Sequence, residues 1–183
     1  IENVPPNIQN STLPALNDTV AAVANALVHI DEYKNNLDIN KHEFLKGLWD
    51  GTGRTRMNMD LDKKKETTSV DSGVILSGQE MPTADIALFS RLIFLSFSKS
   101  TFTEEEKRNY QVLKKMRVQG MSHLAMEILK LRSRIEADFP AIYQRTMDEV
   151  DGLLNDLVIE DRILLNWVAP LAVFHCLEAY LDT

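Results

Sequence analysis

Three short apolar runs, separated by segments with helical patterns, place the tightest limits on the fold of this chain. They lie at residues 26–30, 73–78 and 92–97. Each is short enough for a strand and apolar enough to be buried on both faces of a sheet. Strands that alternate with helices are typical of a parallel sheet with crossover connections. We therefore predict an α/β domain over residues 1–99.

The segments between these runs predict the other elements of that domain. Apolar residues recur at helical spacing over about residues 12–25 and 40–49, and residues 85–90 fit a shorter helix. Residues 54–72 instead alternate with the period of a strand. That alternation predicts an exposed two-stranded hairpin.

From residue 100 onward the pattern is helical. Thr103 and Glu106 have the spacing of a capping box, which predicts a helix over residues 104–118. Punctuation by Gly120, Pro140 and Gly152 predicts three further helices, at residues 121–136, 139–154 and 160–181. The last of these is apolar on most sides, so we expect it at the centre of an all-α bundle formed by residues 100–183.

Composition narrows the possible settings and partners of the chain. The net charge of −7 excludes a globally basic nucleic-acid binder, although a local basic patch remains possible. The single cysteine, Cys176, permits no internal disulfide and favours a reducing, cytoplasmic compartment. No apolar run reaches the ~18 residues that would span a bilayer, so we expect no membrane contact. A start at Ile1 with no signal peptide suggests a fragment of a longer protein.

The first candidate site is the acidic end of the first apolar run, Asp31-Glu32. Acidic residues at the carboxyl end of a buried strand lie where open α/β sheets bind their ligands. In P-loop ATPases such an aspartate helps to hold Mg²⁺, and the neighbouring glutamate can polarise the attacking water. A strand end that is simply acidic and solvated explains this pair equally well.

Two more candidates follow the later runs. Gln79 lies just beyond the second strand, where an amide can hydrogen-bond a γ-phosphate or the attacking water. Arg91 precedes the third run, where an arginine could stabilise a transferring phosphate in a neighbouring subunit. The other interpretations are an ordinary turn at Gln79 and a surface ion pair for Arg91.

The order of these features resembles the second half of the ATPase core of AAA+ proteins. The resemblance is strongest to superfamily-three-like helicases in primase–helicase proteins of phages and bacterial mobile elements. Residues 26–33, Ala-Leu-Val-His-Ile-Asp-Glu-Tyr, resemble the Walker B strand of these helicases. Residues 77–82, Ser-Gly-Gln-Glu-Met-Pro, resemble their sensor-1 region, although Asn is more usual there than Gln79. Ser90-Arg91 resembles their arginine-finger position.

Residues 45–59 are similar to one subgroup, the large proteins of bacterial mobilizable elements. The resemblance as a whole covers roughly residues 10–98. It implies a partial P-loop NTPase core, from the Walker B strand to the arginine finger, in a homo-oligomer that acts on DNA in replication or mobilisation. It also implies ATP and Mg²⁺ as cofactors of the full-length parent.

One departure from that family limits the expectation. The chain contains no Gly-x-x-x-x-Gly-Lys-Ser/Thr sequence, and the family places this P-loop before the Walker B strand. Without its backbone amides and lysine, the β- and γ-phosphates have no cradle. We therefore expect that these 183 residues alone neither bind ATP tightly nor hydrolyse it.

The predicted hairpin is the candidate contact for DNA, which we expect to be single-stranded. Its basic residues supply charge for phosphates: Arg54, Arg56, Lys63, Lys64 and Lys65. The stretch holds no aromatic residue for base stacking, and nearby acidic residues reduce its net charge. A solvated charged turn is the competing interpretation.

The histidines and the cysteine support no metal or thiol site. His29, His42, His123 and His175 have no metal-ligand spacing. We expect His29 to be packed or hydrogen-bonded to its neighbours, and His175-Cys176 to lie in a helical core. Two hypotheses remain: an ATPase fragment of a helicase-type protein, and a non-enzymatic oligomerisation or partner-binding module built on a truncated core.

Overall fold

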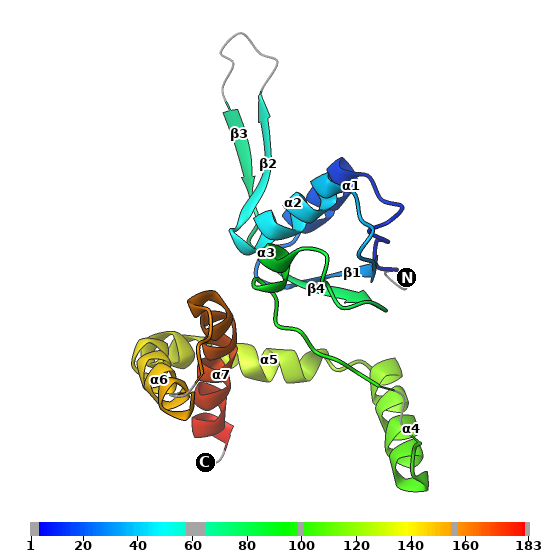
Figure 1. Cartoon of the computed structure of the whole chain (residues 1–183). Helices are drawn as coiled ribbons and strands as arrows, with labels where there is room; N and C mark the ends of the chain where they lie inside the picture. Colours follow the sequence, from blue (N-terminus) through cyan, green and yellow to red (C-terminus); the bar gives the residue numbers. More distant parts are fainter. Residues whose placement is uncertain (1–3, 58–64, 99–100, 155–156, 182–183) are drawn as a thin grey trace. The chain divides into compact units, whose positions relative to one another are not determined.

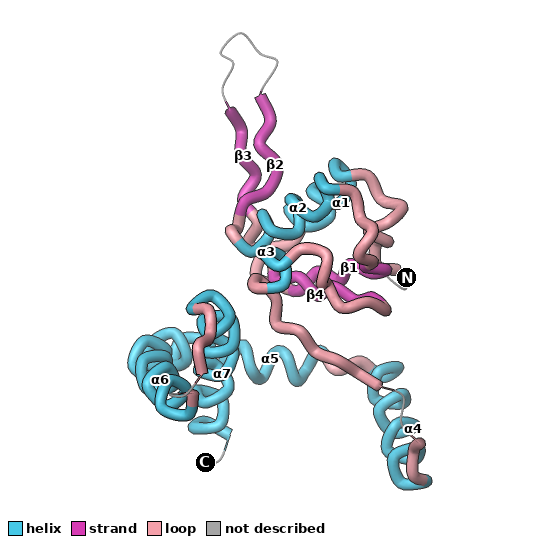
Figure 2. Tube along the Cα trace, in the orientation of Figure 1, coloured by secondary structure: helices cyan, strands magenta, loops and turns pink. Residues whose placement is uncertain are grey.

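The computed structural model describes the chain over residues 4–57, 65–98, 101–154 and 157–181. It divides into two compact units, unit 1 (Ile1–Leu92) and unit 2 (Ile93–Thr183). The division falls somewhat before the boundary expected after residue 99. Unit 1 is an α/β structure and unit 2 contains helices only, among the residues described (Figures 1 and 2).

Unit 1 contains three helices and four strands among its described residues. In chain order these are α1 (Leu13–Ala21), β1 (Leu27–Tyr33), α2 (Ile39–Trp49), β2 (Thr52–Met57), β3 (Lys65–Ser69), β4 (Gly73–Gly78) and α3 (Ile86–Phe89). The predicted crossover is present, because β1 and β4 pair in parallel although the helix α2 and the hairpin β2–β3 separate them in sequence (Figure 1).

The parallel sheet has a further partner on the other edge of β1. Asn7 forms an isolated parallel bridge with Asp31. The Ile8 backbone N–H donates to the Asp31 carbonyl at 2.9 Å, and the Asp31 N–H donates to the Pro6 carbonyl at 3.0 Å. The backbone on both sides of Asp31 is therefore fixed by hydrogen bonds.

One face of this sheet carries the core of unit 1. Val28 and Ile30 point into a cluster with side chains of the three helices, including the fully buried Leu16 and Leu88. The alternate residues of β1 point the other way, and Leu27 is 69% exposed. Strand alternation thus separates an apolar, packed face from an open face.

The hairpin expected at residues 54–72 is present as β2 and β3. The two strands pair antiparallel, with Thr55 opposite Thr67 and Met57 opposite Lys65. The hairpin follows Gly51, whose φ of 66° takes the chain out of α2 in a left-handed conformation that glycine adopts without strain.

The third predicted strand, at residues 92–97, is wrong. Residues 93–98 adopt no regular structure, and their side chains are exposed, Phe97 by 91%. A strand is stable only when a neighbour accepts its hydrogen bonds, and the described residues offer this segment no such neighbour. The local preference of Ile93 and Phe94 for strand geometry is therefore not realised.

Unit 2 contains four helices among its described residues: α4 (Glu104–Gln119), α5 (Ser122–Lys130), α6 (Arg132–Leu153) and α7 (Asp161–Leu181). The expected break at Pro140 is wrong, because α6 runs through it and the chain breaks at Leu131 instead. Proline removes one helical hydrogen bond, to the carbonyl of Glu136. Both residues are exposed, so water can solvate that carbonyl.

The interior of unit 2 is a single seam between α6 and α7. Val168, Ala172 and Cys176 are fully buried there. Thr146 Oγ donates to the Ile142 carbonyl at 2.8 Å and lies 3.1 Å from His175 Nδ1 across the seam. His175 and Cys176 thus belong to a helix–helix interface, as expected.

The expected central position of α7 in a bundle is not what the described residues show. It packs along α6, and apolar residues such as Phe174 remain exposed, by 64% in that case. Its length and a mean hydropathy of 1.4 would allow it to cross a membrane, by composition alone. Core helices of soluble proteins pass the same test. Among the helices described, α7 is the one candidate of this kind.

Candidate functional site

The acidic pair lies in a β-bulge at the carboxyl end of β1. The register runs regularly from Leu27↔Gly73 to Ile30↔Leu76 and then shifts, so that Tyr33 pairs with Gly78. Asp31 and Glu32 together therefore oppose the single residue Ser77. Bulges re-aim side chains and are frequent beside functional sites.

Glu32 has an unusual backbone conformation within the bulge. Its φ is 66°, in the left-handed region that non-glycine residues rarely occupy. Such a conformation costs about 1 kcal/mol or more unless the surroundings hold it. The Glu32 N–H donates to Asp31 Oδ1 at 2.8 Å, which is one interaction that holds it. Strain of this kind often accompanies functional sites.

The Asp31 carboxylate is the end of a short polar chain on the open face of the sheet. Ser77 Oγ donates a short hydrogen bond to Asp31 Oδ1. His29 Nε2 lies 2.7 Å from the same Ser77 oxygen. Because the serine proton points to Asp31, His29 must donate its Nε2–H to Ser77. The expectation that His29 is hydrogen-bonded to a neighbour is met by Ser77, across the sheet.

These contacts lower the pKa of Asp31 below its ordinary value. The largest cause is the Ser77 hydrogen bond, followed by the Glu32 backbone N–H. Both bonds end on Oδ1, so Oδ2 remains for a cation or its bound water. The group is an ionised, oriented carboxylate at neutral pH.

Close approach of the two strand ends explains the glycine beyond Ser77. A Cβ at Gly78 would lie 2.5 Å from the Tyr33 carbonyl oxygen, which is backbone and cannot easily move. Gly78 thus allows β4 to continue beside the bulge. Gln79 follows directly and is exposed.

The loops that leave β1 and β4 are joined by Asn35. Its backbone N–H donates to Glu80 Oε2 at 2.7 Å and its side-chain amide donates to the Met81 carbonyl at 2.9 Å. Asn35 Oδ1 also accepts from the Ala84 N–H at 3.3 Å. These bonds fix the loop that carries Gln79 relative to the loop that follows Glu32.

Arg91 is held against the helices of unit 1. Its Nη1 donates to the Ala87 carbonyl at 2.7 Å, and its guanidinium lies 5.7 Å from the centre of the Trp49 ring. Its Nε is buried without a hydrogen-bond partner among the described residues. The structure shows no bond between Arg91 and the Asp31–Glu32 bulge.

Three of the basic residues assigned to the candidate DNA contact lie on the described strands of the hairpin. Arg54 and Arg56 belong to β2, and Lys65 begins β3. Lys63 and Lys64 lie outside the described residues. The backbone therefore places Arg54, Arg56 and Lys65 on an antiparallel hairpin.

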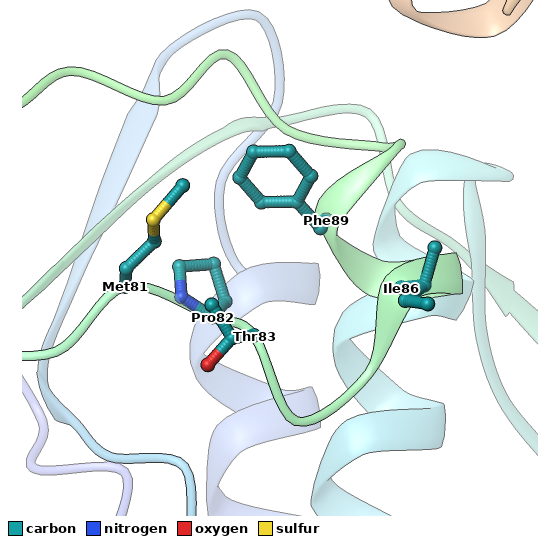
Figure 3. A pocket seen from close by; sticks show the side chains of 5 residues that line it. All are labelled: Met81, Pro82, Thr83, Ile86 and Phe89. Carbon is teal, nitrogen blue, oxygen red and sulfur yellow. The ribbon is translucent and has the colours of Figure 1, made fainter.

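A separate open pocket of about 140 Å³ lies beside α3. Met81, Pro82, Thr83, Ile86 and Phe89 line it, and Figure 3 shows that they come from the loop after β4 and from α3. The lining is almost wholly apolar. It suits an apolar side chain better than a phosphate.

Sequence reasoning did not assign three residues to this site: Ser77, His29 and Asn35. His29 and Asp31 share a strand face by simple alternation, which was a usable signal. The contribution of Ser77 depends on the register of β4, which no local pattern reveals. Among the described residues, no group of three or more His, Cys, Asp or Glu side chains could hold a metal ion. A magnesium ion bound through one carboxylate and water remains compatible with Asp31.

Comparisons with known proteins add no relative: no protein family, curated protein or solved structure matches this chain.

Proposed function

We propose that this chain supplies the magnesium-binding and water-activating half of an ATP site in a helicase-type ATPase. The observation that carries the proposal is the Asp31–Glu32 bulge at the carboxyl end of β1, opposite Ser77 of the parallel strand β4. Open α/β sheets bind ligands at this edge. A solvated acidic turn needs neither an oriented carboxylate nor a left-handed glutamate.

In this proposal each residue has a distinct role. Asp31, ionised and fixed through Oδ1, offers Oδ2 to Mg²⁺ or to its water. Glu32, turned by the bulge, accepts a proton from the attacking water. Gln79 contacts the γ-phosphate or that water, on a loop fixed by Asn35. When bound, Mg²⁺ neutralises charge on the phosphates.

Arg91 acts on the ATP site of a neighbouring subunit in this proposal. Its guanidinium stacks near Trp49, and its buried Nε has no hydrogen-bond partner among the described residues. An arginine that is held in place in this way could complete a site in trans. The hairpin β2–β3 couples the cycle to movement of single-stranded DNA in a mobile-element protein.

The phosphate cradle of such a site lies outside these residues. No P-loop sequence occurs in the chain, so the groups that hold the β- and γ-phosphates come from another segment or subunit. The 183-residue chain alone is expected not to turn over ATP. Magnesium-dependent turnover by the chain alone, abolished by Glu32→Gln, would contradict this expectation.

The open face of the sheet favours a second candidate, a non-enzymatic partner-binding or oligomerisation module. Parallel sheets are normally covered on both faces. Here Leu27 and Ile75 are 69% and 49% exposed on the uncovered face. A degenerate core retained for assembly would keep this face and would have no use for the charge of Asp31.

Binding of Mn²⁺, followed by NMR, tests the first candidate on the chain itself. Mn²⁺ substitutes for Mg²⁺ at oxygen sites and broadens the signals of nearby nuclei. We expect selective broadening of the amide signals of Asp31, Glu32 and Ser77 at millimolar Mn²⁺. Asp31→Asn should remove this broadening, while Glu32→Gln should largely preserve it.

Asp148→Asn is the matched control, because it removes one carboxylate from the exposed surface of α6. It should leave the pattern at β1 unchanged. Broadening that is spread over all acidic surfaces, or that persists in Asp31→Asn, would favour the assembly module. In the natural protein, a P-loop encoded upstream together with ATPase activity lost in Glu32→Gln would support the ATPase.

A further inference from the structure

Helix α4 is basic beyond its acidic first turn, although the chain as a whole is acidic. The net charge of the protein is −7. Residues 107–119 nevertheless contain no aspartate or glutamate. They hold five basic residues: Lys107, Arg108, Lys114, Lys115 and Arg117. Every residue of α4 is exposed. A concentration of positive charge on one exposed helix attracts anionic partners.

The basic residues are arranged on one side of α4. At 3.6 residues per turn, four of them project within an arc of about 120°. We call these four the basic arc: Lys107, Arg108, Lys114 and Lys115. The apolar residues Val112, Leu113, Met116 and Tyr110 occupy the other side. Glu104, in the first turn, and Val118, in the last turn, also project within this arc. Between these two residues the arc presents basic and uncharged polar side chains only.

Intramolecular contacts leave most of this charge available. Lys107 pairs with Glu104 at 2.7 Å, but both side chains are exposed and such a pair contributes little. Lys114 lies 4.9 Å from the centre of the Tyr110 ring, which does not neutralise it. Arg108 and Lys115 form no ion pair with the residues that the structure describes.

We propose that the basic arc of α4 binds the phosphate backbone of a nucleic acid. Its two basic pairs, Lys107-Arg108 and Lys114-Lys115, are seven residues apart, which is about 10 Å along the helix axis. That separation is comparable to about three phosphate spacings of a nucleic-acid strand at ~3.4 Å each. The proposal adds a second surface to the proposed DNA interaction, and it rests on that interaction only for the choice of DNA as probe.

Charge within the apolar side argues for nucleic acid over an anionic membrane. Helices that lie in a membrane interface bury a continuous apolar face. On α4, Glu106 and Arg117 project between Leu113 and Tyr110. Burial of this face among acyl chains would desolvate both charges, whereas phosphate binding uses the basic arc alone.

The test is binding of a fluorescein-labelled single-stranded oligonucleotide to the 183-residue chain, measured by anisotropy between about 50 and 200 mM salt. The α4 variant replaces Lys107, Arg108, Lys114 and Lys115 with Gln, which keeps helix propensity. It should bind at least about tenfold more weakly at low salt, with a salt slope that is smaller by about 0.7 for each lost contact. Circular dichroism checks that the helix persists.

The control removes the same charge from α5 and α6, where the residues already have intramolecular partners: Lys130, Arg132, Arg134 and Arg145 to Gln. It should bind as wild type does. The inference is overturned if the α4 variant binds as wild type does, including the case in which only a Lys63–Lys65→Ala variant loses binding. That last result would leave the proposed hairpin contact standing.

Anionic phosphatidylserine vesicles form the final arm of the test. Vesicle binding that is lost in the α4 variant, with oligonucleotide binding unchanged, would assign the basic arc to lipid and overturn the inference. The Mn²⁺ experiment at Asp31 is independent of every arm, so a failed ATP-site proposal and a failed α4 proposal are distinguishable.

Discussion

Unit 1 buries side chains from each of its three helices against one face of a parallel sheet, whereas unit 2 buries little more than the seam between α6 and α7. In unit 1, Ile8, Leu16, Ile30 and Leu88 are fully buried although they are distant in sequence. In unit 2 the fully buried residues of α7 face one neighbouring helix. The fold of unit 1 therefore depends on long-range contacts, and that of unit 2 depends largely on helix formation.

The difference between the two units affects how the residues proposed to act in each unit depend on its core. Every residue proposed for the ATP site lies in unit 1, where the bulge exists because β4 and the segment around Asn7 hold β1 on its two edges. Loss of the core should therefore remove the site. The basic arc of α4, by contrast, needs only a formed helix, and it should survive damage to unit 1.

The largest expected effect is a loss of stability, and one leucine substitution in each unit compares the two units. Leu16→Ala empties a fully buried position in α1, and the free energy of unfolding of unit 1 should fall by about 2–5 kcal/mol. Leu153→Ala removes the same atoms from a side chain that is 84% exposed, and should change stability by less than about 0.5 kcal/mol. Urea unfolding, followed through NMR signals of each unit, measures both.

The Leu16→Ala protein should retain the helical signals of α6 and α7 at urea concentrations that unfold β1 and β4. If both units unfolded together in wild type and variant, the distinction between a long-range core in unit 1 and local helices in unit 2 would be contradicted. The two units would then form one cooperative structure.

A second pair of substitutions should have opposite signs in the two units. Gly78→Ala places a Cβ 2.5 Å from the Tyr33 carbonyl, and should destabilise unit 1 by about 1–3 kcal/mol. Gly152→Ala meets nothing within 4 Å and lies inside α6, so it should stabilise unit 2 by up to about 1 kcal/mol. Thermal unfolding of the two variants, monitored unit by unit, gives both signs.

Gly120→Ala is a useful third variant, since its φ of 89° penalises any side chain although nothing lies within 4 Å. Its destabilisation would separate the effect of backbone conformation from that of steric contact. Equal melting temperatures for Gly78→Ala and wild type would show that the strand ends are not closely packed.

Local signals in the sequence predicted the elements whose causes are local. The capping box of Thr103 and Glu106 fixes the start of α4, as expected. The alternation at residues 54–72 predicted the hairpin, and the run at residues 26–30 predicted β1.

The predictions that were wrong or incomplete failed for reasons that lie outside the local sequence. The run at residues 92–97 lacks a pairing partner among the described residues, and no local pattern could show that. Pro140 is tolerated in α6 because its surroundings are solvated. The partnership of Ser77 with Asp31 depends on a register that a bulge shifts by one residue. Sequence reasoning thus found the acidic pair but not the group that orients it.

The smallest expected effect concerns that partnership and the pH dependence of unit 1. Since the pKa of Asp31 is lowered in the folded state, chiefly by Ser77, its contribution to stability is present above the unfolded value of about 3.9. It is lost as pH falls through the lower folded value. Ser77→Ala should raise the pKa of Asp31 toward its ordinary value and lower stability at pH 7 by at most about 1 kcal/mol. The difference from wild type should vanish in acid.

Carboxyl NMR titration of Asp31 in wild type, Ser77→Ala and Ser69→Ala measures this shift directly. Ser69 donates to Asp71, outside the bulge, so its removal should leave the Asp31 titration unchanged. The Ser77→Ala effect should be confined to unit 1, because Ser77, Glu32 and His29, the groups that lower the Asp31 pKa, all lie in that unit. An unchanged Asp31 pKa in Ser77→Ala would mean that the bulge backbone, through the Glu32 N–H, orients the carboxylate without the serine. In that case the ATP-site geometry would depend on β1 alone, and the parallel partner strand would serve only the core.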